Sequence, residues 1–263
     1  MRVLRRGDAP RGAALQNLRR GCLVEQAEKL KAVVSWSGGK DAALSCWRAM
    51  RRYHVTHLLN MMAEDGLFSR SHRIRADVLR LQGEAMGLPV VQVSSSWETY
   101  EPQFKEALSG LKEEGVRVGI FGDIDLEEHR QWVERVSGES GMEAVLPLWG
   151  EMVREQLIEE LITAGFEAVV VAVRRDLLGP EWLGRRIDRD FVRDISRVEG
   201  VDISGEGGEY HTLVLSGPLF ARKIRITRAE TVTHDNHSFL DIRECALTEK
   251  DDPPGGVSGG RGC

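Results

Sequence analysis

The sequence predicts an α/β fold, in which a doubly wound parallel sheet of five strands is followed by a second, smaller α+β domain. Three observations lead to this prediction. Short apolar runs alternate with helical patterns between residues 31 and 148. A glycine-rich turn separates the first apolar run from the first helix. Beyond residue 149 the alternation ends, and strands surround a glycine- and acid-rich segment. A chain of 263 residues has room for both domains.

The first strand and helix enclose the most informative segment, which reads VVSWSGGKD over residues 33–41. Its first residues are apolar and β-branched, as in a buried strand, and residues 42–50 suit a helix packed along one side. Gly38 and Gly39 allow successive backbone N–H groups to turn toward one point, where the positive end of the helix begins. Such a turn is typical of a loop that binds pyrophosphate or a similar anion.

The side chains of this loop extend the argument. Ser37 offers a hydroxyl donor, and Lys40 offers a positive charge. The loop does not follow the Walker pattern, because Asp41 comes after Lys40 where that pattern has serine or threonine. The alternative is an ordinary Gly-Gly turn without a ligand, but the strand before the turn and the helix after it favour phosphate binding.

The next elements complete the predicted parallel sheet. Strands are expected at 57–62, 89–93, 116–121 and 144–146, and helices at 74–86, 100–114 and 127–138. In such sheets, ligands bind beyond the carboxyl ends of the strands. A polar stretch at 63–73 and Asp123 both follow predicted strands. We therefore expect them to line one crevice together with the glycine-rich loop.

The second domain is less regular. A helix is expected at 153–163, a strand at 168–173, a helix at 191–197, a turn region at 201–212, and strands at 213–215 and 223–233. The predicted divisions are a basic N-terminal extension at 1–30, a nucleotide-binding domain at 31–148, the α+β domain at 149–245, and a disordered tail at 246–263 that is rich in glycine and proline.

Composition excludes several classes of protein. Apolar residues make up 41% of the chain and charged residues 29%, as in an ordinary globular protein. The net charge of -5 argues against non-specific nucleic-acid binding. The four cysteines have no C-x-x-C spacing, which argues against a zinc knuckle or a redox pair. With no long apolar run or signal peptide, we expect a cytoplasmic protein that does not enter membranes.

A second cluster reads GEGGEYHT over residues 205–212. Glu206, Glu209 and His211 share a backbone that glycines allow to bend sharply, so the carboxylates suit magnesium binding, positioning of an amine, or proton transfer. A solvated hairpin is the alternative for this cluster. Helix capping is the alternative for Asp123, and a solvated basic loop is the alternative for His72.

The motifs together resemble the ATP-binding family that includes diphthine–ammonia ligase, a branch of the N-type ATP pyrophosphatases with their PP-loop. The matching pieces, in order, are SWSGGKD at 35–41, SRSH at 69–72, LQGEAMGLP at 81–89, FGDI at 121–124, PLW at 147–149, WLGR at 182–185, GEGGEYHT at 205–212 and GPLF at 217–220. They span roughly residues 31–225. The resemblance implies an adenine nucleotide alpha hydrolase-like domain, with a cleft between it and a smaller domain.

The resemblance also implies a chemistry, in which Mg-ATP adenylates an acceptor carboxylate and free ammonia then displaces AMP to leave an amide. The nucleotide-binding residues that it implies are Ser35, Ser37, Gly38, Gly39, Lys40, Asp41, Asn60 and His72. The catalytic residues that it implies are Lys40, Asp41, Asp123, Glu206, Glu209 and His211. Asp41 is in addition the residue expected to reach Mg²⁺. The partners are then ATP, ammonium and an unidentified carboxylate acceptor, and a homodimer is compatible with the sequence.

Three departures from the family pattern keep other functions open. Ala42 occupies the place where the loop motif usually has serine, and Arg73 the place where glycine is expected. The basic N-terminal extension lies outside the resemblance. A lost hydroxyl that bonds a charged phosphate costs about 1.5–3 kcal/mol if nothing replaces it. One alternative is therefore a nucleotide-binding sensor without turnover. Another is a sulfur-inserting tRNA-modifying enzyme, which requires a cysteine near the cleft.

Overall fold

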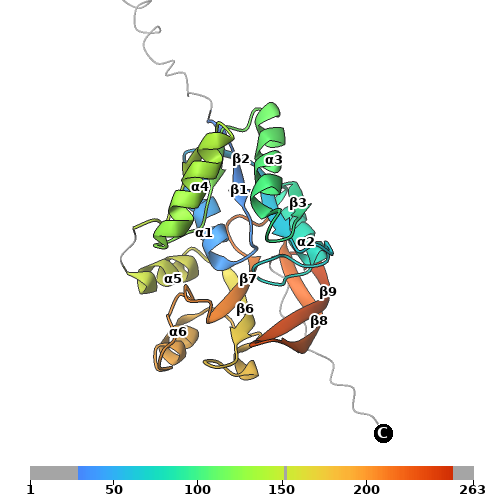
Figure 1. Cartoon of the computed structure of the whole chain (residues 1–263). Helices are drawn as coiled ribbons and strands as arrows, with labels where there is room; N and C mark the ends of the chain where they lie inside the picture. Colours follow the sequence, from blue (N-terminus) through green and yellow to red (C-terminus); the bar gives the residue numbers. More distant parts are fainter. Residues whose placement is uncertain (1–28, 151–152, 251–263) are drawn as a thin grey trace, which may run out of the picture.

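The computed structural model describes residues 29–150 and 153–250. Figure 1 shows a sheet with helices on both of its faces, and below it a second unit built around another sheet. Within the described residues the first unit alternates strictly between strand and helix, which confirms the α/β fold. Its elements are β1 (Lys31–Ser35), α1 (Lys40–Ala49), β2 (His54–Met62), α2 (Ala76–Met86), β3 (Val90–Ser94), α3 (Tyr100–Glu113), β4 (Val118–Ile120), α4 (Glu127–Glu139) and β5 (Glu143–Val145).

The first sheet has the strand order β3-β2-β1-β4-β5, and every neighbouring pair is parallel. The order reverses at β1, so the loops after β1 and β4 diverge and leave a crevice at the carboxyl edge. On one face, Phe104 and Leu108 of α3 and Val136 of α4 pack against Val33 and Leu59 of the sheet. Helices α1 and α2 cover the other face.

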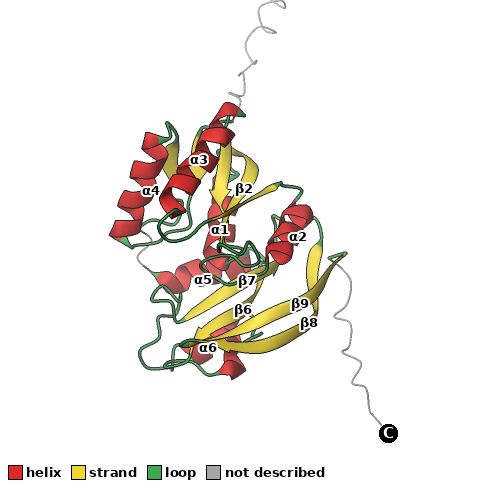
Figure 2. Cartoon of the chain, turned by 45° about the vertical axis from the view of Figure 1, so that its right-hand side comes forward, coloured by secondary structure: helices red, strands yellow, loops and turns green. Residues whose placement is uncertain are grey.

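The second unit is a four-stranded antiparallel sheet with the order β7-β6-β9-β8 (Figure 2). Its elements are α5 (Arg154–Thr163), β6 (Glu167–Arg174), the 3-10 helix η1 (Pro180–Trp182), α6 (Arg189–Ile195), β7 (Tyr210–Ser216), β8 (Lys223–His234) and β9 (His237–Thr248). Strand β6 is apolar over nearly its whole length, because successive side chains point to opposite faces of the sheet and are buried on both.

One hydrophobic core joins the two units. It contains Leu44 of α1, Leu79 of α2, Leu157 of α5 and Val170 of β6, all nearly inaccessible to solvent. Polar contacts reinforce the junction, for example the ion pair of 2.6 Å between Arg75 Nε and Asp241 Oδ1. The second unit is therefore fixed against the helices that carry the glycine-rich loop.

The largest differences from the predicted elements lie in the second unit. Strand β9 was not predicted, and it runs through residues 246–248, where the sequence predicts the start of a disordered tail. Strand β9 pairs antiparallel with β8 along the whole length of both strands, and this pairing orders residues 246–248. Strand β7 begins at Tyr210, inside the predicted turn region 201–212. The predictions for residues 1–28 and 251–263 lie outside the described residues, and no helix that the structure describes is long and apolar enough to cross a membrane.

Candidate active site

The glycine-rich loop joins β1 to α1 at the carboxyl edge of the first sheet. Gly38 has φ +83°, a left-handed conformation that favours glycine. Gly39 is needed for space, because a Cβ there would lie 2.7 Å from Cε1 of His72. Helix α1 starts at Lys40, and Gly39 before it has no side chain to cap the first N–H groups. The loop therefore places backbone donors and the positive helix end together, as predicted for anion binding.

Lys40 is held in place before any ligand binds. Its side chain is buried, and Nζ donates to Asp41 Oδ2 at 2.7 Å. The ammonium also lies 5.7 Å from the centre of the Tyr210 ring, which comes from β7 of the second unit. Both the charge of Lys40 and its carboxylate partner thus belong to the junction between the two units.

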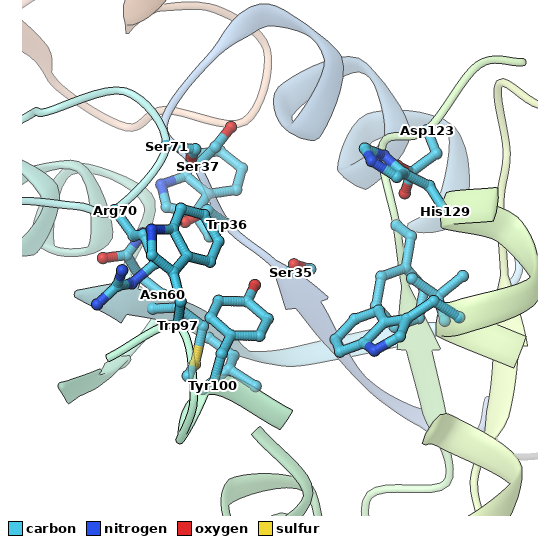
Figure 3. A pocket seen from close by; sticks show the side chains of 15 residues that line it. Ser35, Trp36, Ser37, Asn60, Arg70, Ser71, Trp97, Tyr100, Asp123 and His129 are labelled. Atoms are coloured by element: carbon cyan, nitrogen blue, oxygen red, sulfur yellow. The ribbon is translucent and has the colours of Figure 1, made fainter. Parts of the chain in front are cut away.

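Two cavities meet at this loop. The aromatic cavity, of about 380 Å³, lies over the carboxyl ends of β1, β2 and β4 and contains the rings of Trp97, Tyr100 and Trp132 (Figure 3). The polar cavity, of about 300 Å³, lies between the loop and the turn 205–212. They share the lining residues Ser35, Ser37, Ser71, Asp123 and His129. The site is therefore one crevice with an aromatic lobe and a polar lobe.

Asp123 and His129 form a pair at the boundary between the lobes, opposite Ser35 and Ser37 in Figure 3. His129 Nδ1 lies 3.1 Å from Asp123 Oδ1. Asp123 follows β4, and His129 lies in the first turn of α4. Asp123 was predicted from the sequence as a site residue, whereas His129 was not. The available signal was its place at the start of the helix after the predicted strand at 116–121, on the same edge of the sheet as the loop.

Glu206 brings a carboxylate into the polar cavity from the second unit. Burial, and then the negative charge of Asp41, raise its pKa to about 7, while Lys40 and Arg154 oppose the shift. A carboxyl with this pKa gains and loses a proton near neutral pH, as a general acid or base must.

Glu209 lines neither cavity. Its Oε1 accepts a hydrogen bond of 3.2 Å from Asp202 N, and Oε2 has no partner within the described residues. The turn 205–212 thus directs its two predicted carboxylates differently, because Glu206 faces the crevice and Glu209 faces the backbone beneath the turn.

His72 and His211 stack on each other beside the loop, with ring centroids 4.5 Å apart. Burial, and next the charge of Lys40, lower the pKa of His72 to about 4. Burial, followed by the neighbouring His72 and Lys40, lowers the pKa of His211 well below its usual value. Both rings are therefore neutral at pH 7, and they line the polar cavity without adding charge.

Most of the predicted residues come together. Ser35, Ser37 and Asp123 line both cavities, whereas Lys40, Asp41, His72, Glu206 and His211 line the polar one. Asn60 lines only the aromatic cavity, where Nδ2 donates to Trp36 O at 2.6 Å and Oδ1 has no partner among the described residues. Sequence reasoning also missed the aromatic rings, since tryptophans in loops and helices carry no spacing signal for a shared cavity.

The carboxylates of the crevice suit a metal ion only together with other ligands. Within residues 29–150 and 153–250, no group of three or more His, Cys, Asp or Glu side chains is arranged to hold an ion alone. Asp41 and Glu206 do face the same cavity, and the negative charge of Asp41 contributes to the raised pKa of Glu206. One or two carboxylates next to a phosphate site match the way Mg²⁺ is usually held, with phosphate oxygens and water as its other ligands.

Comparison with known proteins identifies the family. Residues 30–144 match the model of the diphthamide synthase N-terminal domain, and residues 153–248 match that of the diphthamide synthase C-terminal domain. The chain is 30% identical over 236 residues to diphthine–ammonia ligase of Danio rerio, covering 78% of this chain and 90% of that protein. It is 29% identical over 234 residues to diphthine–ammonia ligase of Homo sapiens, covering 78% and 86% respectively.

A search of solved structures gave a predicted subunit of tRNA methyltransferase from Methanocaldococcus jannaschii, with a TM-score of 0.39 and 16% identity, covering 72% of this chain and 98% of that one. That likeness adds nothing to the assignment, which rests on the two matched domains and on the relatives of similar length. The chain belongs to the diphthine–ammonia ligase family.

Proposed function

We propose that this protein is an ATP-dependent ligase that converts an acceptor carboxylate to an amide, with ammonia as the nitrogen donor and AMP and pyrophosphate as the other products. The observation that carries the proposal is the single crevice in which the loop of Lys40 faces Glu206 across the polar cavity. A phosphate-binding loop and a carboxyl group with a pKa of about 7 are the two chemical functions that the reaction needs.

The shape of the crevice suggests how ATP binds. Adenosine fits the aromatic lobe, where flat rings can stack on Trp97 or Trp132 and Asn60 offers polar atoms. The pyrophosphate part then lies at the loop, beside Ser37 and Lys40. In this arrangement the α-phosphate, which the acceptor carboxylate attacks, reaches the boundary between the lobes. Asp123 and His129 lie at that boundary.

Charge must be balanced as pyrophosphate leaves. The Lys40 ammonium and the backbone N–H groups of the loop stabilise the leaving group. We propose that Asp41 and Glu206 hold Mg²⁺ together with the phosphates, as the cavity that they share permits. Bound Mg²⁺ supplies further charge neutralisation on the phosphate oxygens.

The second half-reaction needs a base, because ammonium carries one proton too many to attack a carbonyl carbon. His129 is the candidate, since Asp123 engages Nδ1 and leaves Nε2 to accept the proton. Glu206 is the alternative acceptor of that proton if Asp41 alone holds Mg²⁺, because a carboxylate bound to the metal cannot take up a proton. Ammonia then attacks the acyl carbon, the C–O bond to AMP breaks with its electrons going to the AMP phosphate, and the second proton, lost from the new amide nitrogen, goes to that phosphate.

The other functions fit the site less well. Sulfur insertion needs a reactive cysteine beside the crevice. Of the two cysteines within the described residues, Cys46 has a pKa that burial raises to about 12, and Cys245 lies on β9. Ala42 is the one observation that favours a sensor without turnover. Diphthine, named in the relatives, is the first acceptor to test, while a cytoplasmic location and a homodimer stay predictions.

The test is the product formed from α-labelled ATP, Mg²⁺ and ammonium, with and without a diphthine-containing substrate. The proposal expects AMP to appear only when acceptor and ammonium are both present. Formation of ADP would contradict it, and tight ATP binding without turnover on any carboxylate tried would favour the sensor.

A further inference from the structure

The phosphate-binding loop is bound directly by a strand of the second unit. Val214 N on β7 donates to Gly38 O at 2.9 Å. Two residues earlier on the same strand, Thr212 Oγ1 accepts from Lys40 N at 3.0 Å, across a separation of 172 residues. Both Lys40 and Thr212 are almost completely buried. The loop is thus shaped by β7 as well as by the helix that follows it.

Gln82 of α2 completes this arrangement. Its Nε2 donates both to Gly38 O at 3.0 Å and to Val214 O at 2.7 Å, while its Oε1 accepts from Trp36 Nε1 at 2.8 Å. The side chain is fully buried, so it has little freedom to move. Because the loop and β7 are held in register by Gln82, the hydroxyl of Thr212 has a fixed position at the start of α1.

The hydrogen-bonding capacity of Thr212 is only half used. A hydroxyl accepts with its lone pairs and also has one hydrogen to donate. Thr212 Oγ1 accepts from Lys40 N, and within residues 29–150 and 153–250 it donates to no acceptor. Thr212 lines the polar cavity, where a phosphate is the acceptor that the loop is built to receive.

Ala42 makes this hydroxyl more important. It occupies the third position of α1, is buried, and lines the same cavity with a methyl group in place of a hydroxyl. The first turn of α1 therefore offers the phosphate no hydroxyl of its own, and Gly39 before it provides no side-chain cap. Thr212 approaches this turn from the other unit and is bonded to its first backbone N–H.

We propose that Thr212 is a positioning residue for the pyrophosphate group, whose hydroxyl accepts from Lys40 N, donates to a phosphate oxygen, and replaces the hydroxyl that Ala42 lacks. The inference rests on the proposed ATP-dependent function. It also explains why the loop and the second unit are joined at this point, since a phosphate bound there contacts both units through one side chain.

Pyrophosphate, AMP and ATP, each with Mg²⁺, are the probes for the test, and their binding is measured by calorimetry. Thr212→Val keeps the shape of the side chain and removes the hydroxyl. We expect it to weaken pyrophosphate binding about 10- to 100-fold, because the lost bond is to a charged group. AMP, which lacks the pyrophosphate, should bind within about twofold of its parent affinity. Thr212→Ser should stay within about threefold for all three probes.

Two further variants separate phosphate donation from mere support of the loop. Thr231→Val removes an exposed threonine hydroxyl from β8 and should bind pyrophosphate like the parent. Ala42→Ser, added to Thr212→Val, returns a hydroxyl to the loop without restoring the contact to Lys40 N. We expect the double variant to recover about tenfold in pyrophosphate affinity.

The outcomes are distinct. If Thr212→Val binds pyrophosphate with an affinity within threefold of the parent's, the inference is overturned. A loss that Ala42→Ser does not restore, accompanied by a lower unfolding temperature, also overturns it, because Thr212 then only supports the loop. Failure of the parent protein to bind ATP or pyrophosphate would instead overturn the proposed function itself.

Discussion

Replacement of Gly38 by alanine tests how the phosphate-binding loop is built. The backbone of Gly38 has φ +83°, and a Cβ there would lie 2.6 Å from Leu79 Cδ2 and 2.8 Å from Gln82 Oε1. Leu79 can shift only within a filled core, and Gln82 is fixed by its bonds to Trp36, Gly38 and Val214. The added methyl group therefore meets two neighbours that cannot easily move away.

The magnitude follows from two contributions. The left-handed backbone costs an alanine about 1–2 kcal/mol, and overpacking of a filled site costs about 1–3 kcal/mol. We therefore expect Gly38→Ala to lower the free energy of unfolding by about 2–5 kcal/mol. Pyrophosphate binding should be lost as well, since relief of the overlap displaces the backbone donors of the loop.

Two other glycines provide matched controls. Gly87 at the end of α2 has φ +69° but no atom within 4 Å of an added Cβ. Gly87→Ala should therefore lower the free energy of unfolding only by the cost of the left-handed backbone, about 1–2 kcal/mol. Gly110, inside α3, is equally open and has ordinary helical φ, so Gly110→Ala should be neutral or stabilising by up to about 1 kcal/mol. Urea unfolding at 25 °C measures all three. If Gly38→Ala costs no more than Gly87→Ala, the reasoning about the close approach is refuted.

Three further predictions concern charge and proton transfer. Lys40→Met should weaken pyrophosphate binding at least about 10-fold in calorimetry, because a buried positive charge is lost. Lys29→Met changes an exposed lysine and should bind pyrophosphate like the parent. If Lys40→Met and the parent bind pyrophosphate equally well, Lys40 does not belong to the site. Because the pKa of Glu206 is raised from 4.5 to about 7, the folded protein keeps a proton that the unfolded chain releases, so this residue lowers stability as pH rises from 4.5 through 7. Glu206→Gln should therefore gain about 1–2 kcal/mol over the parent between pH 4.5 and pH 8 in urea unfolding, after allowance for solvent screening, and parallel pH profiles would disagree with this assignment. His129→Asn should reduce ammonia-dependent amide formation about 10²- to 10⁴-fold without changing pyrophosphate affinity. Hydroxylamine should largely restore turnover, because this nucleophile is already neutral and needs no base to remove a proton first. Loss of turnover with both nucleophiles would mean that His129 is not the base.

The parts of the fold that could be predicted have a local signal. Helix α2 ends where the sequence predicts, because Gly87 adopts the left-handed conformation of a C-cap. The apolar runs of β2 and β6 were recognised. Strand β2 starts at His54, earlier than the predicted 57, because the polar His54 and Thr56 interrupt the apolar pattern where the strand already pairs with β1. Strand β9 is polar on its exposed side and alternates weakly. The sequence signal for β9 was the pair Asp235-Asn236, which forms the hairpin turn between β8 and β9. In this turn Asp235 has φ 51°.

The site could be predicted only where a motif carries it. The loop at 37–41 and the cluster at 205–212 were identified from their residues, and the structure brings them to one cavity. The places of His129 and the aromatic rings, and the contact of Thr212 with Lys40, depend on packing between elements that are distant in sequence. Glu209 was predicted as a site residue but does not line the crevice. The sequence of a glycine-rich turn does not reveal which of its two carboxylates faces the crevice.

The most direct test of the central claim follows an oxygen atom. If the acceptor carboxylate attacks the α-phosphate, one of its oxygens must end up in AMP when ammonia displaces the nucleotide. A diphthine-containing substrate with ¹⁸O in its carboxylate, incubated with the protein, Mg-ATP and ammonium, should therefore give AMP that carries one ¹⁸O by mass spectrometry, with one amide formed per AMP. Amide formation with unlabelled AMP, or with ADP and labelled phosphate, would contradict the account.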